Sequence, residues 1–214
     1  MRVEDFLEHL TEIDGGSFRD VLEAVPGLAA ENNLALVNLA ARHLEPGESY
    51  VEVGTLRGTS LVAAMRGNEG KDFVAIDSWQ MSGGGRAAVE ANLARFGLPV
   101  PTLLEGDAFE VLRSDALEGR RVGVYYWDAA HGYDAQLEGL RLIEPHLAER
   151  AVLIVDDTDW DRVRRATGDY LAGQPRARLA FEAGGDDHGN PEWWEGVQVL
   201  AWDGRVSPSE TAAS

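Results

Sequence analysis

A fivefold alternation of apolar and amphipathic segments is the feature of this sequence that most limits its fold. The apolar segments predict strands over residues 49–54, 72–79, 101–107, 121–130 and 151–157. Between them, helical spacing predicts helices from residue 59 and over 86–96, 108–112, 133–147 and 160–171. Strands that are apolar throughout are typical of a parallel sheet with helices on both faces.

The last part of the sequence departs from this alternation. Two further strands are predicted over residues 177–183 and 196–202, with no helix between them. Such a pair forms a hairpin, so one of its strands runs antiparallel to the rest of the sheet. The prediction is a Rossmann-like α/β fold with a seven-stranded, mostly parallel sheet and an antiparallel last strand.

The length of 214 residues suits one such domain with an extension before it. Helical spacing predicts an N-terminal helical extension, residues 1–45, from segments at 3–12, 17–24 and 28–44. We expect this extension to pack over the binding pocket or against a second subunit, and we expect the protein to be a homo-oligomer. The sheet domain is expected over residues 46–203, followed by a polar, disordered tail at 204–214.

Charge and composition narrow the partners. Asp and Glu number 37 against 19 Lys and Arg, which gives a formal net charge of −18. Nucleic acids bind basic patches, and the only basic clusters are Arg120-Arg121 and Arg162, Arg164 and Arg165. The sequence has no Cys, no apolar run that could span a membrane, and an acidic, amphipathic start unlike a signal peptide. We expect a cytoplasmic enzyme that acts on a small molecule, without nucleic-acid or membrane partners.

Carboxylates lie at or near the ends of the five strands. In open parallel sheets, ligands bind beyond the carboxyl ends of the strands, so these side chains are expected to meet in one site. The set consists of Glu52, Asp77, Asp107, Asp128 and the pair Asp156-Asp157.

The loop after the first strand has the pattern Glu-x-Gly-x-x-x-Gly, formed by Glu52, Gly54 and Gly58. Gly54 lets the backbone turn sharply off the strand, and Gly58 lets the next helix begin close to a ligand. Thr59 or Ser60 can cap that helix. The spacing differs from the GxGxxG that admits a pyrophosphate in dinucleotide enzymes. An ordinary strand-to-helix turn is the alternative.

The next two strand ends each offer a carboxylate to a nucleoside. Asp77, followed by Ser78, is placed where a carboxylate accepts hydrogen bonds from ribose hydroxyls. Asp107, followed by Ala108, can accept from the adenine amine. The alternatives are a loop or cap role for Asp77 and an N-cap for Asp107, and the cap is compatible with adenine binding.

The segments VEVGTLRGTS, VAID, EGDA, VYYWDAAHGYDAQLEGL and VLIVDDT together resemble class I S-adenosylmethionine-dependent methyltransferases. The chain is similar to the small-molecule O-methyltransferases of natural-product pathways, the macrocin O-methyltransferase-like group, and more distantly to catechol O-methyltransferase. The resemblance covers about half of the chain and the closing hairpin. It implies S-adenosylmethionine as cofactor, a loop shaped by Glu52, Gly54 and Gly58, Asp77 on the ribose and Asp107 on the adenine.

The resemblance also implies a divalent metal. Asp128 at the end of the fourth strand and Asp156 and Asp157 at the end of the fifth would hold Mg²⁺, which prefers such oxygen ligands. The alternative is that Asp128 only contacts the cofactor and the acidic pair caps the next helix. Members of the family often have Asp-Gly-Asp-His where this chain has DAAH at 128–131, so one acid is missing.

His131 and Asp128 are the candidate catalytic residues. Histidine titrates near neutrality and can accept the proton of an attacking hydroxyl, so His131 is the candidate base. The alternative for His131 is a helix-start residue bonded to the backbone, and His188 is a rival base.

Two aromatic segments are candidates for the acceptor wall. One runs from Trp79 to Met81 before Ser-Gly-Gly-Gly at 82–85, which we expect to form a mobile lid, and the other is Trp193-Trp194. Core packing is the alternative for both. The expected reaction is metal-assisted methyl transfer from S-adenosylmethionine to a hydroxyl of a small molecule. An NAD-dependent oxidoreductase and a non-catalytic S-adenosylmethionine-binding protein are the alternatives.

Overall fold

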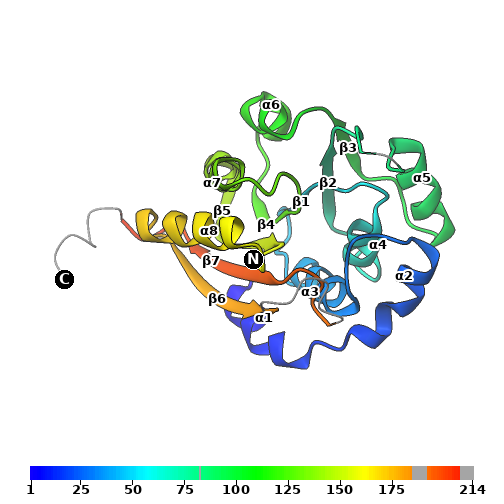
Figure 1. Ribbon diagram of the computed structural model, residues 1–214, viewed down its shortest axis with the longest axis horizontal. Coiled ribbons are helices and arrows are strands. Elements are labelled where there is room, and N and C mark those ends of the chain that lie inside the picture. Colours follow the sequence, from blue (N-terminus) through cyan, green and yellow to red (C-terminus); the bar gives the residue numbers. More distant parts are fainter. Residues whose placement is uncertain (82, 185–191, 208–214) are drawn as a thin grey trace.

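The computed structural model has a central sheet with helices packed around it (Figure 1). The structure describes residues 1–81, 83–184 and 192–207. The described residues form a seven-stranded sheet in the order β3-β2-β1-β4-β5-β7-β6. Its strands are β1 (Ser49–Val53), β2 (Asp72–Asp77), β3 (Thr102–Glu105), β4 (Val122–Trp127), β5 (Leu147–Asp156), β6 (Ala177–Ala183) and β7 (Val197–Asp203).

The pairing of the strands confirms the predicted topology. The pairs β1–β2, β1–β4, β2–β3 and β4–β5 are parallel. Strand β7 lies antiparallel between β5 and β6. The strand order reverses between β1 and β4, and such a switch point opens a crevice at the carboxyl ends of the strands. The edge strands β3 and β6 are only half-buried, unlike the fully apolar strands that the sequence suggested.

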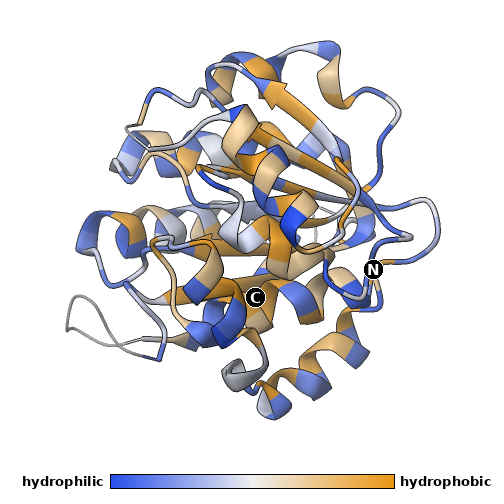
Figure 2. Ribbon diagram, turned by 90° about the vertical axis from the view of Figure 1, so that its right-hand side faces the viewer, coloured by the Kyte–Doolittle hydropathy of each residue, from blue (hydrophilic) through white to orange (hydrophobic). Residues whose placement is uncertain are grey.

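Helices cover both faces of the sheet, as predicted. One face carries α3 (Glu31–Arg42), α4 (Thr59–Met65) and α5 (Arg86–Arg95), and the other carries α6 (Ala108–Arg113), α7 (Tyr133–Ile143) and α8 (Asp161–Gly173). Each face has its own apolar core, since alternate residues of a strand point to opposite faces. In β1, for example, Tyr50 joins the first core and Val51 the second. Figure 2 shows the apolar strands between helices whose other faces are polar.

Several boundaries differ from the predicted ones, among them those of the helix after β4, of β5 and of α3. The helix after β4 ends at Ile143, because the chain continues as a short 3₁₀ turn, Glu144–His146, that contains Pro145. Strand β5 therefore begins at Leu147, and its pairing with β7 begins at Arg150, which lies opposite Asp203. Helix α3 begins at Glu31 instead of Leu28, and residues 26–30 form an open turn in which Leu28 is 56% exposed.

The N-terminal extension packs into the main core. It contains α1 (Val3–His9), α2 (Arg19–Ala24) and α3, and the side chains of Val3, Phe6 and Leu34 are inaccessible to solvent. The described helices include none that is long and apolar enough to cross a membrane.

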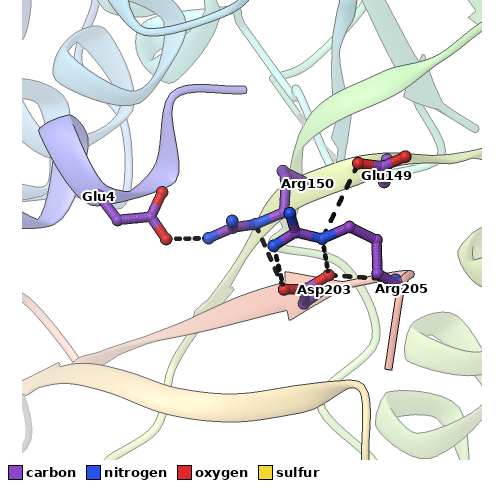
Figure 3. A network of polar contacts seen from close by, with 5 residues as sticks. All are labelled: Glu4, Glu149, Arg150, Asp203 and Arg205. Carbon is purple, nitrogen blue, oxygen red and sulfur yellow. Dashed lines mark hydrogen bonds and ion pairs between the residues drawn. The ribbon is translucent and has the colours of Figure 1, made fainter. Parts of the chain in front are cut away.

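An ion-pair network fastens α1 to the sheet (Figure 3). Arg150 of β5 binds Glu4 of α1, and its Nε lies 3.8 Å from Asp203 at the end of β7. Arg205 completes the network, with 2.6 Å to Asp203 and 3.9 Å to Glu149. Two strand ends and a helix that are far apart in the sequence are thus held at one corner.

The described part of the predicted tail continues from this corner. The amide of Gly204 donates to the carbonyl of Glu149 at 2.8 Å. Arg176 Nε donates to the carbonyl of Val206 at 3.0 Å. Residues 204–207 are therefore bonded to the sheet domain, and the rest of the predicted tail, 208–214, lies outside the described residues.

Candidate active site

A cavity of about 590 Å³ opens beyond the carboxyl ends of β1, β2 and β4. It lies at the reversal of strand order, where open α/β sheets bind their ligands. Most of the predicted site residues line it: Gly54, Thr59, Ser60, Asp77, Ser78, Asp107, Ala108, Asp128, His131 and Asp157. Glu52, Gly58 and Asp156 lie behind this lining.

The loop after β1 is shaped by its glycines. Gly54 has φ +96°, and a Cβ atom there would overlap the carbonyl oxygen of Asp128, so the β1 and β4 loops approach closely only without a side chain. Gly58 has φ +83° and precedes α4. The predicted cap by Thr59 or Ser60 is wrong, because the first turn of α4 has no side-chain cap. Thr59 Oγ1 instead donates to the carbonyl of Val25 at 3.0 Å, which ties the loop to the N-terminal extension.

Asp77 holds two loops at the floor of the cavity. Its carboxylate accepts hydrogen bonds from the amides of Leu56 at 2.7 Å and Trp79 at 2.6 Å. A carboxylate has further lone pairs, so this loop role leaves Asp77 able to accept from a ligand. Asp107 caps α6, accepting from the amides of Phe109 at 2.9 Å and Glu110 at 3.1 Å, and also lines the cavity.

Glu52 lies buried beneath the β1 loop. The hydroxyl of Tyr50 donates to its Oε2 at 3.0 Å. Burial raises the pKa of Glu52 to about 7, although the nearby hydroxyls of Thr55, Tyr50 and Ser60 lower it. The side chain is inaccessible to solvent and does not line the cavity. It therefore supports the loop from below.

The ends of β4 and β5 bring three carboxylates together. The hydroxyl of Tyr126 donates to Asp156 Oδ2 at 2.5 Å, and Asn33 of α3 donates to Asp156 Oδ1 at 3.3 Å. Burial and the nearby charge of Asp157 raise the pKa of Asp156 to about 7. Burial, followed by the charges of Asp156 and Asp157, also raises the pKa of Asp128. Ionising these carboxyls together is therefore unfavourable, because they are buried and their negative charges repel one another.

His131 is paired with Asp157 at the wall of the cavity. Its Nδ1 lies 2.9 Å from Asp157 Oδ2, and this hydrogen bond raises the pKa of the imidazole. Arg162 Nε donates to the carbonyl of His131 at 2.7 Å, which fixes the backbone at this point. His131 precedes the first residue of α7 and its ring bonds to a carboxylate. The backbone-bonded alternative is therefore not observed.

The predicted metal site does not take shape in this arrangement. Within the described part of the chain, no three His, Asp or Glu side chains are placed to hold a metal ion. Asp156 is held by Tyr126 and Asn33, and Asp157 is held by His131. The carboxylates have the right chemistry for Mg²⁺, but their side chains do not converge.

Each aromatic segment divides between core and cavity. Trp79 packs against the core and Met81 lines the cavity. Trp193 packs on Phe181 with ring centroids 5.5 Å apart, and Trp194 lines the cavity. Gly83–Gly85 of the predicted lid bond to the β1 loop: Arg57 Nε donates to Gly83 O at 2.7 Å, and the Gly85 amide donates to Leu56 O at 3.2 Å. Ser82 and the rival base His188 lie outside the described residues.

Several lining residues are not among those predicted from the sequence: Leu28, Tyr126, Trp160 and Glu195. Trp160 follows the β5 carboxylates and could have been found by the rule that site residues follow strand ends. Its indole Nε1 donates to Glu195 Oε2 at 3.0 Å. Leu28 comes from the N-terminal extension, and no local pattern marks it as part of the site.

Comparisons with known proteins agree with this geometry. A family model described as a methyltransferase domain matches residues 51–158, about half of the chain and the stretch that contains every predicted site residue. None of the curated proteins compared matches the chain.

Solved structures share the fold. The O-methyltransferase TomG from Streptomyces achromogenes, involved in tomaymycin synthesis and solved with SAM, is 21% identical with a TM-score of 0.65, over 88% of this chain and 90% of that one. An O-methyltransferase from Bacillus cereus in complex with SAH is 16% identical with a TM-score of 0.60, over 93% and 90%. The SAH-bound methyltransferase PaMTH1 from Podospora anserina is 17% identical with a TM-score of 0.58, over 94% and 88%.

The family model covers the β1 loop and the ends of β2 to β5, and these solved structures share the fold over 88–94% of the chain. These matches confirm the methyltransferase resemblance of the sequence. This chain belongs to the family of methyltransferase domains.

Proposed function

We propose that this protein transfers a methyl group from S-adenosylmethionine to a hydroxyl group of a small molecule. The observation that carries the proposal is that one cavity holds both the Gly54 loop and the His131–Asp157 pair. The first is a place for the cofactor and the second is a base for the acceptor. Solved structures of the same fold were determined with SAM or SAH.

The cofactor would lie along the ends of β1, β2 and β3. Asp77 and Asp107 would accept hydrogen bonds from the ribose and the adenine, and Gly54, Ser78 and Ala108 would line its path. The negative charge of the cavity favours a sulfonium cation. A dinucleotide is disfavoured, because a pyrophosphate needs open backbone amides at the first turn and the carbonyl of Asp128 closes on Gly54 there.

His131 would take the proton of the acceptor hydroxyl. Its Nδ1 faces Asp157, so Nε2 is left to accept that proton, while Asp157 stabilises the imidazolium that forms. The acceptor oxygen attacks the methyl carbon, and the carbon–sulfur bond breaks with its electron pair going to sulfur, which yields S-adenosylhomocysteine. Positioning of the two reactants in one cavity supplies a large part of the acceleration.

Metal assistance is a separate part of the proposal. Asp128, Asp156 and Asp157 would have to leave their present hydrogen bonds to hold Mg²⁺, which when bound would lower the pKa of the acceptor hydroxyl. Their oxygen chemistry and mutual repulsion support a cation, and their present hydrogen bonds oppose one. Proton transfer to His131 does not require the metal.

Calorimetry with S-adenosylhomocysteine and with NAD tests the cofactor. Binding of the first and no heat from the second is expected. Transfer of a labelled methyl group to phenolic and alcoholic acceptors, followed by mass spectrometry, tests the reaction, and His131→Ala should abolish transfer while retaining S-adenosylhomocysteine binding. Tight NAD binding without S-adenosylhomocysteine binding would overturn the proposal. Sedimentation analysis tests the predicted homo-oligomer.

A further inference from the structure

The cavity is lined by apolar side chains and by acidic ones. Leu28, Met81, Trp160 and Trp194 form its apolar walls. The polar groups beside them include His131 and the carboxylates of Asp157 and Glu195. If the proposed function holds, this cavity receives the acceptor, so the side chains that line it select which acceptor binds.

His131 is the basic side chain of the cavity, and its Nδ1 is already paired with Asp157. No Lys or Arg is among the described residues that line it. The segments outside the described residues, 82, 185–191 and 208–214, contain neither Lys nor Arg, so they cannot add one. An acceptor with a phosphate, sulfate or carboxylate would therefore find no ammonium or guanidinium partner in the described lining.

The two arginines that approach the cavity are engaged elsewhere. Arg57 donates to the carbonyls of Gly83 at 2.7 Å and Pro26 at 3.0 Å. Arg162 donates to the carbonyl of His131, and its guanidinium lies 4.1 Å from the ring centroid of Trp160. Drawing either group toward an acceptor anion would break contacts that build the walls.

We propose that the acceptor is a hydroxylated compound without an anionic group, and that an amine-bearing acceptor binds more tightly than a neutral one. This inference rests on the proposed function. Asp157 and Glu195 repel an anion and attract an ammonium group in a partly desolvated cavity. The indole of Trp194 adds a face that also attracts cations.

Substitution of Glu195 tests whether charge selects the acceptor. Its Oε2 accepts from Trp160 Nε1 at 3.0 Å, so Glu195→Gln keeps an acceptor oxygen for the indole and removes the charge. Glu192→Gln is the matched control, because Glu192 is exposed and does not line the cavity.

The experiment measures binding of three phenols to the protein loaded with S-adenosylhomocysteine: 4-(aminomethyl)phenol, 4-(hydroxymethyl)phenol and 4-hydroxybenzoate. The dissociation constant should rise at least tenfold from the amine to the carboxylate, with the alcohol between them. The ratio of the two dissociation constants, carboxylate to amine, should become smaller in Glu195→Gln and with added salt. It should stay at the wild-type value in Glu192→Gln.

Two results would overturn the inference: 4-hydroxybenzoate binding as tightly as the amine, or all three phenols failing to bind the loaded protein. The proposed function fails separately, through loss of S-adenosylhomocysteine binding or absence of methyl transfer. If the three phenols bind in the expected order but no methyl group is transferred, the charge selection is supported and the proposed reaction is wrong.

Discussion

At the scale of single residues, the His131–Asp157 pair joins sequence, electrostatics and chemistry most directly. The bond to Asp157 raises the pKa of His131 above its usual value of 6.5. A raised pKa makes the imidazole a stronger base, but the neutral form is populated only at higher pH. The pair therefore sets both the strength and the pH range of the proposed base.

The first prediction concerns this pH range. Methyl transfer by the wild-type protein should rise with pH through a midpoint above 6.5, because only neutral His131 can take a proton. In Asp157→Asn the charge that stabilises the imidazolium is lost, so the midpoint should move toward 6.5 and the maximal rate should fall. A pH profile of kcat/KM measures both. An unchanged midpoint in a folded variant would show that another group is the base.

Glu52 allows a second prediction, on stability. Its pKa is about 7 in the folded protein, against the usual 4.5 of a glutamate carboxyl, so the folded state favours the protonated acid. Its contribution to stability is complete below about pH 4.5 and is lost as pH rises toward 7. At 1.36 kcal/mol per unit, the loss is at most about 3 kcal/mol.

Glu52→Gln removes this titration. The free energy of unfolding of the wild type should fall relative to that of the variant between pH 5 and pH 8, by up to about 3 kcal/mol. Urea unfolding of both proteins at the two pH values measures the difference. Parallel pH dependence of the two proteins would mean that Glu52 is ionised in the folded state throughout.

At the scale of elements, the ends of β4 and β5 carry the three carboxylates that were predicted to bind a metal. Strand pairing places Trp127 opposite Val155, so Asp128 and the Asp156-Asp157 pair follow at neighbouring strand ends. Neighbouring parallel strands bring their carboxyl ends to one edge, which is why the sequence could place the three acids together. It could not foresee that Tyr126 and Asn33 hold Asp156.

The third prediction follows from this cluster. If Mg²⁺ assists the reaction, EDTA should abolish methyl transfer, and Mg²⁺ or Mn²⁺ should restore it, since the ion relieves the repulsion between the carboxylates. S-adenosylhomocysteine binding in EDTA is the control and should persist. Full turnover in EDTA would remove metal assistance and leave the His131–Asp157 pair as the source of activation.

Arg57 connects three elements around the cavity and carries a fourth prediction. Its guanidinium bridges the Pro26 turn of the extension and Gly83 of the β2 loop, and both segments supply walls of the cavity. Arg57→Ala should raise the acceptor KM roughly tenfold, about 1.4 kcal/mol, in keeping with hydrogen bonds from a charged donor. The effect on kcat should be smaller.

Arg95→Ala is the matched control for Arg57. Arg95 Nη1 donates to the carbonyl of Ala24 at 2.9 Å, so it holds the same extension, and among the described residues it makes no hydrogen bond to the Gly83 segment. We expect its acceptor KM to stay near the wild-type value. Equal effects of the two variants would point to general loosening of the extension.

At the scale of the whole molecule, the N-terminal extension is part of the folded core. Leu34 and Leu36 of α3 are inaccessible to solvent, and α3 packs on α4. The turn between α2 and α3 supplies Gly27, Leu28 and Ala29 to the cavity. Removal of residues 1–44 would uncover one face of the sheet and open the site, so the extension serves stability and acceptor binding together.

The fifth prediction tests this with a single substitution. Phe6 of α1 is inaccessible to solvent, and Phe6→Ala should lower the free energy of unfolding by about 3–5 kcal/mol. Val100→Ala is the control: Val100 is 52% exposed, so this substitution should change the free energy of unfolding by no more than about 0.5 kcal/mol. Urea denaturation compares the two. A near-neutral Phe6→Ala would mean that α1 docks only weakly.

The sequence by itself determined the sheet, its antiparallel end and the acids at its edge. These follow from local periodicity and from the geometry of parallel strands, which need no knowledge of distant contacts. Gly54 was also identifiable, because a sharp turn off a strand demands a residue without a side chain.

Only the tertiary structure decided the partners of those residues. Leu28 and Glu195 reach the cavity from segments remote from β1, and Thr59 bonds to Val25 instead of capping its helix. Asp156 turns toward Asn33, 123 residues away in the chain. Which side chains meet across such separations depends on the packing of whole elements, and no local pattern in the sequence encodes it.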